Sequence, residues 1–239
     1  MTPPIRPRNP RGQGARLRTD IVRAAEELMD EHGTDRAVTL RSVARRVGIS
    51  APSIYAHFAD VDGIFFAVVE EALADLGRRM QAAAEGEADP VGRLRAVCAA
   101  YLQFAVDFPQ RYRLMFAGIW NPPEVEGGTT APGEPLLVGN LAFGAVQQAV
   151  ADCAAAGRSP STDPFRTSAA LWAALHGLAE LRRTTPRFPW APDLQDDLVD
   201  LLALGGAADH GRGGRDRLRT PSGPAAPRRP AWGSPAPAP

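Results

Sequence analysis

Lysine is absent from this 239-residue sequence, in which all 27 basic residues are arginine. Any phosphate held by a basic side chain must therefore be held by a guanidinium, whose planar fork suits phosphate oxygens. Cysteine is nearly absent as well. Cys98 and Cys153 alone exclude a disulfide framework, so we expect both to be reduced residues of the core.

Long hydrophobic runs are also missing. No stretch approaches the roughly 18 uninterrupted apolar residues that a membrane span requires, and the N-terminal residues contain no apolar run like that of a secretory signal. Hydrophobic residues make up 44% of the chain and charged residues 23%, which is ordinary for a soluble globular protein. We therefore expect a cytoplasmic protein with no membrane partner.

The motifs of several enzyme and metal classes do not occur. There is no Gly-rich phosphate loop, no HExxH helix and no cluster of paired cysteines. A small helical enzyme that uses His176 with Glu180, one turn further along, is an alternative from another class. General acid–base catalysis would need a further group converging on that pair. We therefore expect no enzyme activity, no cofactor and no metal.

Strand-like alternation is absent too, whereas apolar residues recur at helical spacing, so the predicted fold class is all-α. Thr19, Thr39, Ser50 and Asp60 each precede a helical pattern and can cap it. Gly33 and Gly48 are expected to end the first and second helices, and Pro52 fits the first turn of the third. The fourth helix is expected to run to about Ala84, and further helices are expected over 91–107, 109–118, 136–156, 164–184 and 193–204.

Charge is distributed unevenly along the chain. The residues up to Phe58 carry a net charge of +4, residues 59–204 carry −8, and the segment from Gly205 carries +4. A basic head on an acidic body fits a module that binds a polyanion, joined to a second module. Uneven solvation of surfaces would produce the same distribution.

Composition divides the chain into four segments. Residues 1–17 are rich in Pro and Arg and are predicted to be a disordered arm, and residues 205–239 a disordered tail. Between them we expect a smaller helical domain over 18–62 and a larger helical domain over 63–204, with a Pro- and Gly-rich loop from Asn121 to Pro135.

The segment from Thr39 to Phe58 carries the functional signal. Two short helices joined at Gly48-Ile49-Ser50 are typical of a helix-turn-helix, in which the second helix enters the major groove of DNA. This arrangement leaves small residues at the exposed end of the recognition helix, where the backbone can approach base edges closely. These residues are Ala51, Pro52 and Ser53.

The same segment closely resembles the TetR family of repressors. The resemblance rests on the first helix up to Gly33 and on Thr39, Val43-Ala44, Gly48-Ile49-Ser50, Ile54-Tyr55 and His57-Phe58. It implies phosphate contacts by Thr39, Ser50, Tyr55 and His57, and base contacts by Arg41, Ala51, Pro52 and Ser53. The family often has a basic residue just after the position of Asp60. Val61 and Asp62 stand here, which implies that one phosphate contact is lost.

Alternatives remain for two of these residues: Tyr55 could be a core aromatic, and His57 an ordinary surface residue. The resemblance also implies an N-terminal three-helix DNA-binding domain followed by a helical bundle that binds a ligand and dimerises. As partners it implies a double-stranded operator, a second copy of the chain and an unknown small-molecule effector. A homodimer on a palindromic operator is also the physical expectation, because one recognition helix reads few base pairs. A regulator controlled by a protein partner is a further alternative.

The body contains candidate ligand-binding residues. Leu171-Trp-Ala-Ala-Leu-His-Gly177 resembles a TetR subgroup with a Trp/His-Gly signature, although Trp172 stands one turn before His176 instead of beside it. An apolar pocket between helices is the usual setting for a small-molecule site, and the same residues at helical spacing would also fit a plain core. The candidates are Tyr101, Phe104, Met115, Phe116, Trp120, Trp172 and His176.

Overall fold

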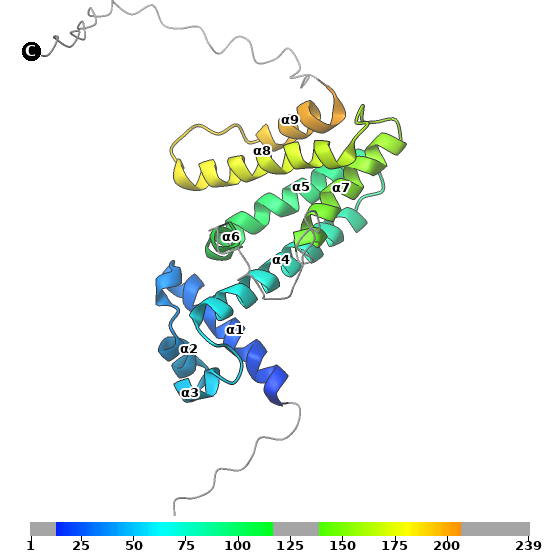
Figure 1. Cartoon of the computed structure of the whole chain (residues 1–239). Helices are drawn as coiled ribbons and strands as arrows, with labels where there is room; N and C mark the ends of the chain where they lie inside the picture. Colours follow the sequence, from blue (N-terminus) through cyan, green and yellow to red (C-terminus); the bar gives the residue numbers. More distant parts are fainter. Residues whose placement is uncertain (1–12, 117–138, 207–239) are drawn as a thin grey trace, which may run out of the picture. The chain divides into compact units, whose positions relative to one another are not determined.

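The computed structural model describes residues 13–116 and 139–206, and these residues form helices and no β-strand (Figure 1). The all-α fold class is thereby confirmed. Predictions that fall on residues 1–12, on the loop from Asn121 to Pro135, on Trp120 and on residues 207–239 lie outside the described residues.

Three helices at the N-terminal end pack around one small core (Figure 1). They are α1 (Gln13–His32), α2 (Leu40–Val47) and α3 (Ala51–Ile54), and a 3-10 turn over Asp35–Ala37 links the first two. Apolar side chains at helical spacing are buried here, and others are only partly buried. The buried ones include Ile21, Val22, Ala25, Leu28, Val43, Ile54 and Phe58, and the partly buried ones include Leu40, Val47 and Ile49.

Helix α1 begins earlier than predicted. Thr19 does not cap it: the Thr19 hydroxyl donates to the Ala15 carbonyl one turn back, at 3.2 Å, inside a helix that already starts at Gln13. Residues 13–17 were assigned to a disordered arm, and that assignment is wrong for them. Leu17 packs against the hydrophobic core, which gives the extra turn an apolar anchor.

Helix α4 (Val61–Glu85) joins the N-terminal helices to the body. Asp60 caps it as predicted, with its carboxylate accepting from the Gly63 amide at 2.8 Å. Ile64, Val68 and Leu76 lie on its buried stripe. The helix runs without a break through residue 62, where a domain boundary was expected, and it packs against α1 as well as against the helices of the body.

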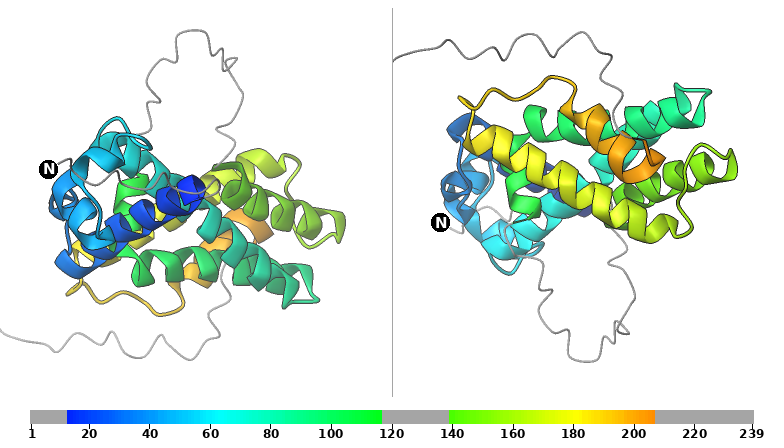
Figure 2. Two further views of the ribbon diagram at one scale, coloured as in Figure 1. Left: turned by 90° about the horizontal axis from the view of Figure 1, so that it is seen from below. Right: turned by 90° about the horizontal axis from the view of Figure 1, so that it is seen from above.

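The body consists of α5 (Pro90–Asp107), α6 (Pro109–Met115), α7 (Gly139–Ala155), α8 (Pro164–Thr184) and α9 (Leu194–Val199). Helices α4, α5 and α7 pack against one another, and α8 packs against α5 and α7 (Figure 2). Helix α9 continues into a π-helical turn over Asp200–Leu204, where a regular helix to residue 204 was expected. Both of these last elements pack against α8.

Candidate functional site

The turn between α2 and α3 has the geometry of a helix-turn-helix. Gly48 adopts the left-handed conformation, with φ 76° and ψ 31°, which the lack of a Cβ makes inexpensive. The amide of the next residue, Ile49, donates a hydrogen bond to the Ala44 carbonyl at 2.9 Å. This exit fixes the direction in which α3 leaves α2, so Gly48 determines how α3 is presented.

Helix α2 starts with a complete capping box. The Thr39 hydroxyl accepts from the Ser42 amide at 3.1 Å, and the Ser42 hydroxyl accepts from the Thr39 amide at 2.8 Å. The predicted cap at Thr39 is confirmed. Both orphan amides are satisfied within the protein, and the Thr39 side chain still lies at the surface.

Helix α3 is a single turn, and Ser50 does not cap it through its side chain. The Ser50 hydroxyl instead lies 2.7 Å from the Ser53 hydroxyl, which offers it an alternative partner. Tyr55, Ala56 and His57 follow in turn conformation before the chain reaches the cap of α4. The recognition element is therefore one helical turn extended by a second, non-helical turn.

The candidate DNA-contact residues all lie at the surface. Thr39, Arg41, Ser50, Pro52 and Tyr55 are exposed, and Ala51, Ser53 and His57 are partly exposed. Tyr55 is 60% exposed, so it is not the core aromatic of the alternative interpretation.

Arginine availability on α2 differs from residue to residue. Among the described residues Arg41 and Arg45 form no ion pair, whereas Arg46 is paired with Glu27 and Glu31 of α1. Sequence reasoning missed Arg45, although its spacing of one turn from Arg41 signals a shared face. Two unpaired guanidinium groups on one helix suit a phosphate backbone.

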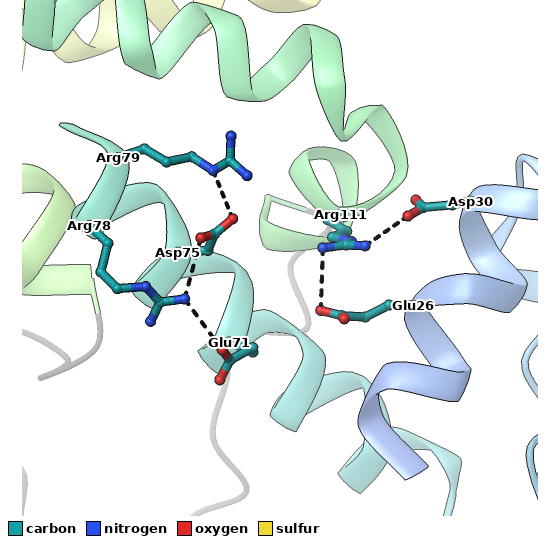
Figure 3. Close-up of polar contacts among 7 residues, drawn as sticks. All are labelled: Glu26, Asp30, Glu71, Asp75, Arg78, Arg79 and Arg111. Carbon is teal, nitrogen blue, oxygen red and sulfur yellow. Dashed lines mark hydrogen bonds and ion pairs between the residues drawn. The ribbon is translucent and has the colours of Figure 1, made fainter. Parts of the chain in front are cut away.

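Helix α6 connects the body to the DNA-binding helices through charge (Figure 3). Arg111 lies 2.8 Å from Asp30 and 3.7 Å from Glu26, both on α1. Arg113, two residues further along, lies 3.2 Å from Asp35 in the turn that follows α1. The contact between α6 and α1 thus depends on ion pairs that the sequence did not signal, because their partners lie about eighty positions apart.

Some of the buried polar atoms at this contact between α6 and α1 lack a hydrogen-bond partner among the described residues. Glu26 is only 8% exposed, and burial raises the pKa of its carboxyl group, although the guanidinium of Arg111 lowers it. Among the described residues, Glu26 Oε1, Gln110 Oε1 and Arg111 Nε are buried without a hydrogen-bond partner. Buried polar atoms without partners cost free energy, so this interface is less stable than its ion pairs suggest.

The candidate ligand residues in the body divide by depth. Tyr101, Phe104 and Met115 are buried almost completely and belong to the core. Phe116 and His176 are partly exposed and Trp172 is 40% exposed. The rings of Phe116 and His176 lie 4.3 Å apart, and those of Phe116 and Trp172 6.2 Å apart, so these three form one accessible cluster.

A hydrogen-bond chain connects the buried and the accessible residues. The Tyr112 hydroxyl of α6 lies 2.9 Å from the Tyr101 hydroxyl of α5 and 2.8 Å from His176 Nδ1 of α8. Burial raises the pKa of Tyr101 to about 12, and it raises that of Tyr112 as well. Tyr112 was not among the candidates, because its role depends on three helices that only the fold brings together.

The surroundings of His176 disfavour the enzyme alternative. Burial lowers the pKa of His176, and Glu180, which would have been its catalytic partner, instead accepts hydrogen bonds from Arg183. That pairing lowers the pKa of the Glu180 carboxyl group. Nδ1 of His176 is engaged by Tyr112, so the described residues assemble no acid–base pair here.

None of the described helices is long and apolar enough to cross a membrane.

An exposed helix-turn-helix at the head of an all-helical body defines a DNA-binding regulator. Two family models match the chain: that of bacterial regulatory proteins of the tetR family over residues 21–68, and that of the tetracyclin repressor-like C-terminal domain over residues 94–204. The chain belongs to the tetR family and is a DNA-binding transcriptional regulator.

Solved structures share the fold. A protein with unknown function from Rhodococcus sp. RHA1 is 26% identical, with a TM-score of 0.62 over 78% of this chain and 95% of that one. The TetR family transcriptional regulator PfmR from Thermus thermophilus is 19% identical, with a TM-score of 0.53 over 76% of this chain and 96% of that one. The fatty acid degradation regulator FadR from Bacillus halodurans is 14% identical, with a TM-score of 0.55 over 79% and 98%.

Proposed function

We propose that this regulator is a repressor that binds a palindromic operator as a homodimer and is released by a small-molecule effector. The observation that carries the proposal is the surface from Thr39 to His57, where hydroxyl groups, a phenol, an imidazole and unpaired guanidinium groups lie exposed together. Thr39, Ser50, Tyr55 and His57 contact phosphates, and Arg41, Ala51, Pro52 and Ser53 reach base edges. Arg45 adds a further phosphate contact.

Exposed apolar side chains on the outer helices support dimerisation. Leu181 on α8 and Leu201 and Leu202 in the π-helical turn are exposed large apolar residues, and Leu201 is 56% exposed. Large apolar side chains left exposed on a folded chain are typical of protein–protein surfaces. A second copy of the chain would bury them around a two-fold axis and place two recognition elements on the two halves of a palindrome.

Release by an effector is supported by the position of α6. This seven-residue helix directs Tyr112 toward the aromatic cluster of the body and Arg111 toward α1. A molecule that displaces the cluster would therefore disturb the ion pairs that hold the DNA-binding helices. The operator would then be released if the altered position of α1 no longer fits both half-sites.

The test combines operator selection with measurements of oligomeric state. Binding of the full chain to random duplexes, followed by enrichment, should yield a two-fold symmetric sequence, and fluorescence anisotropy should show a steep fall in affinity with salt. Equal affinity for enriched and random duplexes at moderate salt would contradict the proposal. Repression is checked by placing the enriched sequence over a promoter in a reporter strain with and without the gene.

A matched pair of variants separates dimerisation from general surface effects. Leu201→Glu should convert the dimer into a monomer in analytical ultracentrifugation and abolish tight operator binding. Val106→Glu is the control, because Val106 is also apolar and is 71% exposed but lies at the end of α5, beside Ala179 and Arg182 of α8, and is not part of the π-helical turn that carries Leu201. A dimer in both variants would place the two-fold interface elsewhere.

A further inference from the structure

The hydrogen-bond chain in the body has a direction that its donors determine. Among the described residues, the Tyr101 hydroxyl has one hydrogen-bond partner, the Tyr112 hydroxyl, which is therefore the acceptor available for its hydrogen. Tyr101 must then give its own hydrogen to Tyr112, 2.9 Å away. Tyr112 in turn donates to His176 Nδ1 at 2.8 Å.

The opposite direction would leave a buried hydrogen without an acceptor. If His176 Nδ1 carried a proton and donated to Tyr112, then Tyr112 would donate to Tyr101. The hydrogen of Tyr101 would then have no acceptor among the described residues, and this side chain is only 2% exposed. An unmade hydrogen bond at such depth is costly, so the first direction is the stable one.

This direction fixes the tautomer of His176. With Nδ1 as acceptor, a neutral imidazole carries its proton on Nε2. Within the described part of the chain no hydrogen bond joins Nε2 to another residue, and the side chain is partly exposed. His176 therefore offers one further N–H donor, on Nε2, where this series of hydrogen bonds ends.

Among the described residues, the charged side chain that acts on His176 is Glu180, and it is itself in an ion pair. Burial lowers the pKa of His176, which keeps the ring neutral at pH 7, although Glu180 opposes the shift. Glu180 itself is neutralised by Arg183. The described rings next to His176 are those of Tyr112 and Phe116. A charged molecule entering among them would lose its hydration without gaining a counter-charge.

The rings themselves favour a flat ligand. Phe143 lies 5.3 Å from Phe165 and 6.3 Å from Trp172, both in edge-on arrangements, and Phe116 adjoins Trp172 and His176. Trp172 is 40% and Phe165 is 60% exposed, so this aromatic set can be approached from solvent. Tilted and edge-on rings around an accessible edge suit a planar aromatic partner.

We propose that this cluster binds an uncharged, planar aromatic molecule bearing a hydrogen-bond acceptor, and that His176 Nε2–H donates to that acceptor. Phe116, Trp172, Phe143 and Phe165 contact the rings of the ligand. Tyr101 and Tyr112 act as positioning residues that hold the imidazole in the donating tautomer. The inference rests on the proposed function, because it names the chemical class of the effector.

The tautomer can be measured directly. Long-range ¹H–¹⁵N spectra of histidine-labelled protein, with the His176 signals assigned from their loss in His176→Gln, should show protonated Nε2 and unprotonated Nδ1. In Tyr112→Phe the fixed tautomer should give way to a mixture of both. A protonated Nδ1 in the wild type would overturn the proposal.

Ligand class is tested by calorimetry with three naphthalenes of one shape. 2-Acetylnaphthalene offers a carbonyl acceptor, 2-isopropenylnaphthalene is its isostere without an acceptor, and 2-naphthoate is anionic. The wild type should bind the ketone about 2- to 12-fold more tightly than the alkene, the range expected for one net hydrogen bond, and the anion more weakly than either. Equal affinity for ketone and alkene, a preference for the anion, or no binding of any probe would each overturn the proposal.

Two variants at one position complete the test. His176→Phe keeps an aromatic ring but removes the donor, so the preference for the ketone should disappear while the alkene still binds. His176→Gln keeps an N–H donor and should retain part of the preference. Operator binding without any probe is measured in parallel. If the wild type does not bind the operator, the proposed function is refuted. If it binds the operator but does not discriminate among the probes, this inference alone is refuted.

Discussion

Tyr55 and Tyr112 carry the same hydroxyl group in opposite surroundings. Tyr55 is 60% exposed and its hydroxyl lies at the surface that the family uses for DNA, whereas Tyr112 is 2% exposed and its hydroxyl serves two protein partners. Removing one oxygen atom from each therefore separates the two functions of the molecule. The exposed tyrosine should influence affinity, and the buried one should influence stability.

We predict that Tyr55→Phe weakens operator binding by about 0.5–1.5 kcal/mol per protomer, the net worth of one hydrogen bond, with the melting temperature nearly unchanged. Tyr112→Phe is the matched change, and it should lower the free energy of unfolding by about 1–3 kcal/mol because the buried Tyr101 and the partly buried His176 lose their partner. Anisotropy titrations and chemical denaturation measure the two quantities. A lower melting temperature with unchanged operator affinity in Tyr55→Phe would make Tyr55 structural.

Glu26 provides a second test at the residue scale. Because burial raises the pKa of its carboxyl group above the usual 4.5, the folded state binds this proton more tightly than the unfolded state does. Its contribution to stability is therefore present below about pH 4.5 and is lost as the pH rises through the raised pKa. Glu26→Gln should remove that loss, so the variant should gain stability relative to the wild type as the pH rises. A difference in unfolding free energy that is constant from about pH 4 to about pH 8 would contradict this assignment.

At the scale of the element, the turn between α2 and α3 depends on a single backbone conformation. Gly48 has φ 76°, and a Cβ added there would meet no atom within 4 Å, so any cost of substitution comes from the backbone alone. A Cβ added at Gly144, in the interior of α7, would also meet no atom within 4 Å, but Gly144 has no positive φ. These two glycines form a matched pair.

We predict that Gly48→Ala lowers the free energy of unfolding by about 1–2 kcal/mol, because a left-handed residue with a Cβ is strained. Gly144→Ala should raise it by about 0.5–1 kcal/mol, because alanine favours a helix interior. Thermal denaturation measures both, and operator affinity should fall in the first variant only. Equal effects of the two substitutions would show that the turn does not depend on a left-handed residue.

The helices were predictable from sequence to the extent that their signals are local. Thr39 and Asp60 cap as predicted because each hydroxyl or carboxylate meets an amide three residues ahead. Thr19 and Ser50 failed as caps because other local partners, the Ala15 carbonyl and the Ser53 hydroxyl, take their side chains. Cap propensity identifies residues able to bond a helix end, but it does not decide between competing partners.

The candidate ligand site was less predictable, because the burial of a side chain and the partners it bonds depend on tertiary packing. Helical spacing placed Tyr101, Phe104 and Met115 on apolar faces but could not separate buried core from accessible edge. Tyr112 and Arg111 gained their roles from partners on other helices, at separations that no local pattern encodes. The proposed DNA-binding surface, by contrast, follows one continuous segment, so the motif alone was enough to predict it.

For the whole molecule, the change from a basic to an acidic sequence coincides with the start of α4. The basic head ends at Phe58, immediately before the cap of α4, and the acidic body follows. Within the head, Arg46 is neutralised by α1, while Arg41 and Arg45 are unpaired among the described residues. The unpaired positive charge of the described part of the head therefore includes Arg41 and Arg45 of α2, Arg36 in the turn before it, and Arg16, which is exposed near the start of α1.

The last prediction concerns the residues before α1. Arg6, Arg8 and Arg11 precede any acidic residue, and the helix that follows them belongs to the DNA-binding part. Removal of residues 1–12 leaves α1 intact and should weaken operator binding and flatten its salt dependence. The slope of log K against log salt should fall by about 2 or more for a dimer, since each lost phosphate contact removes about 0.9.

The matched control removes residues 207–239, which contain six arginines and two aspartates at the other end of the chain. That deletion should leave the slope, the melting temperature and dimerisation unchanged. An unchanged slope in both truncated proteins would exclude the N-terminal arginines as DNA contacts and would leave the salt dependence to α2 and α3.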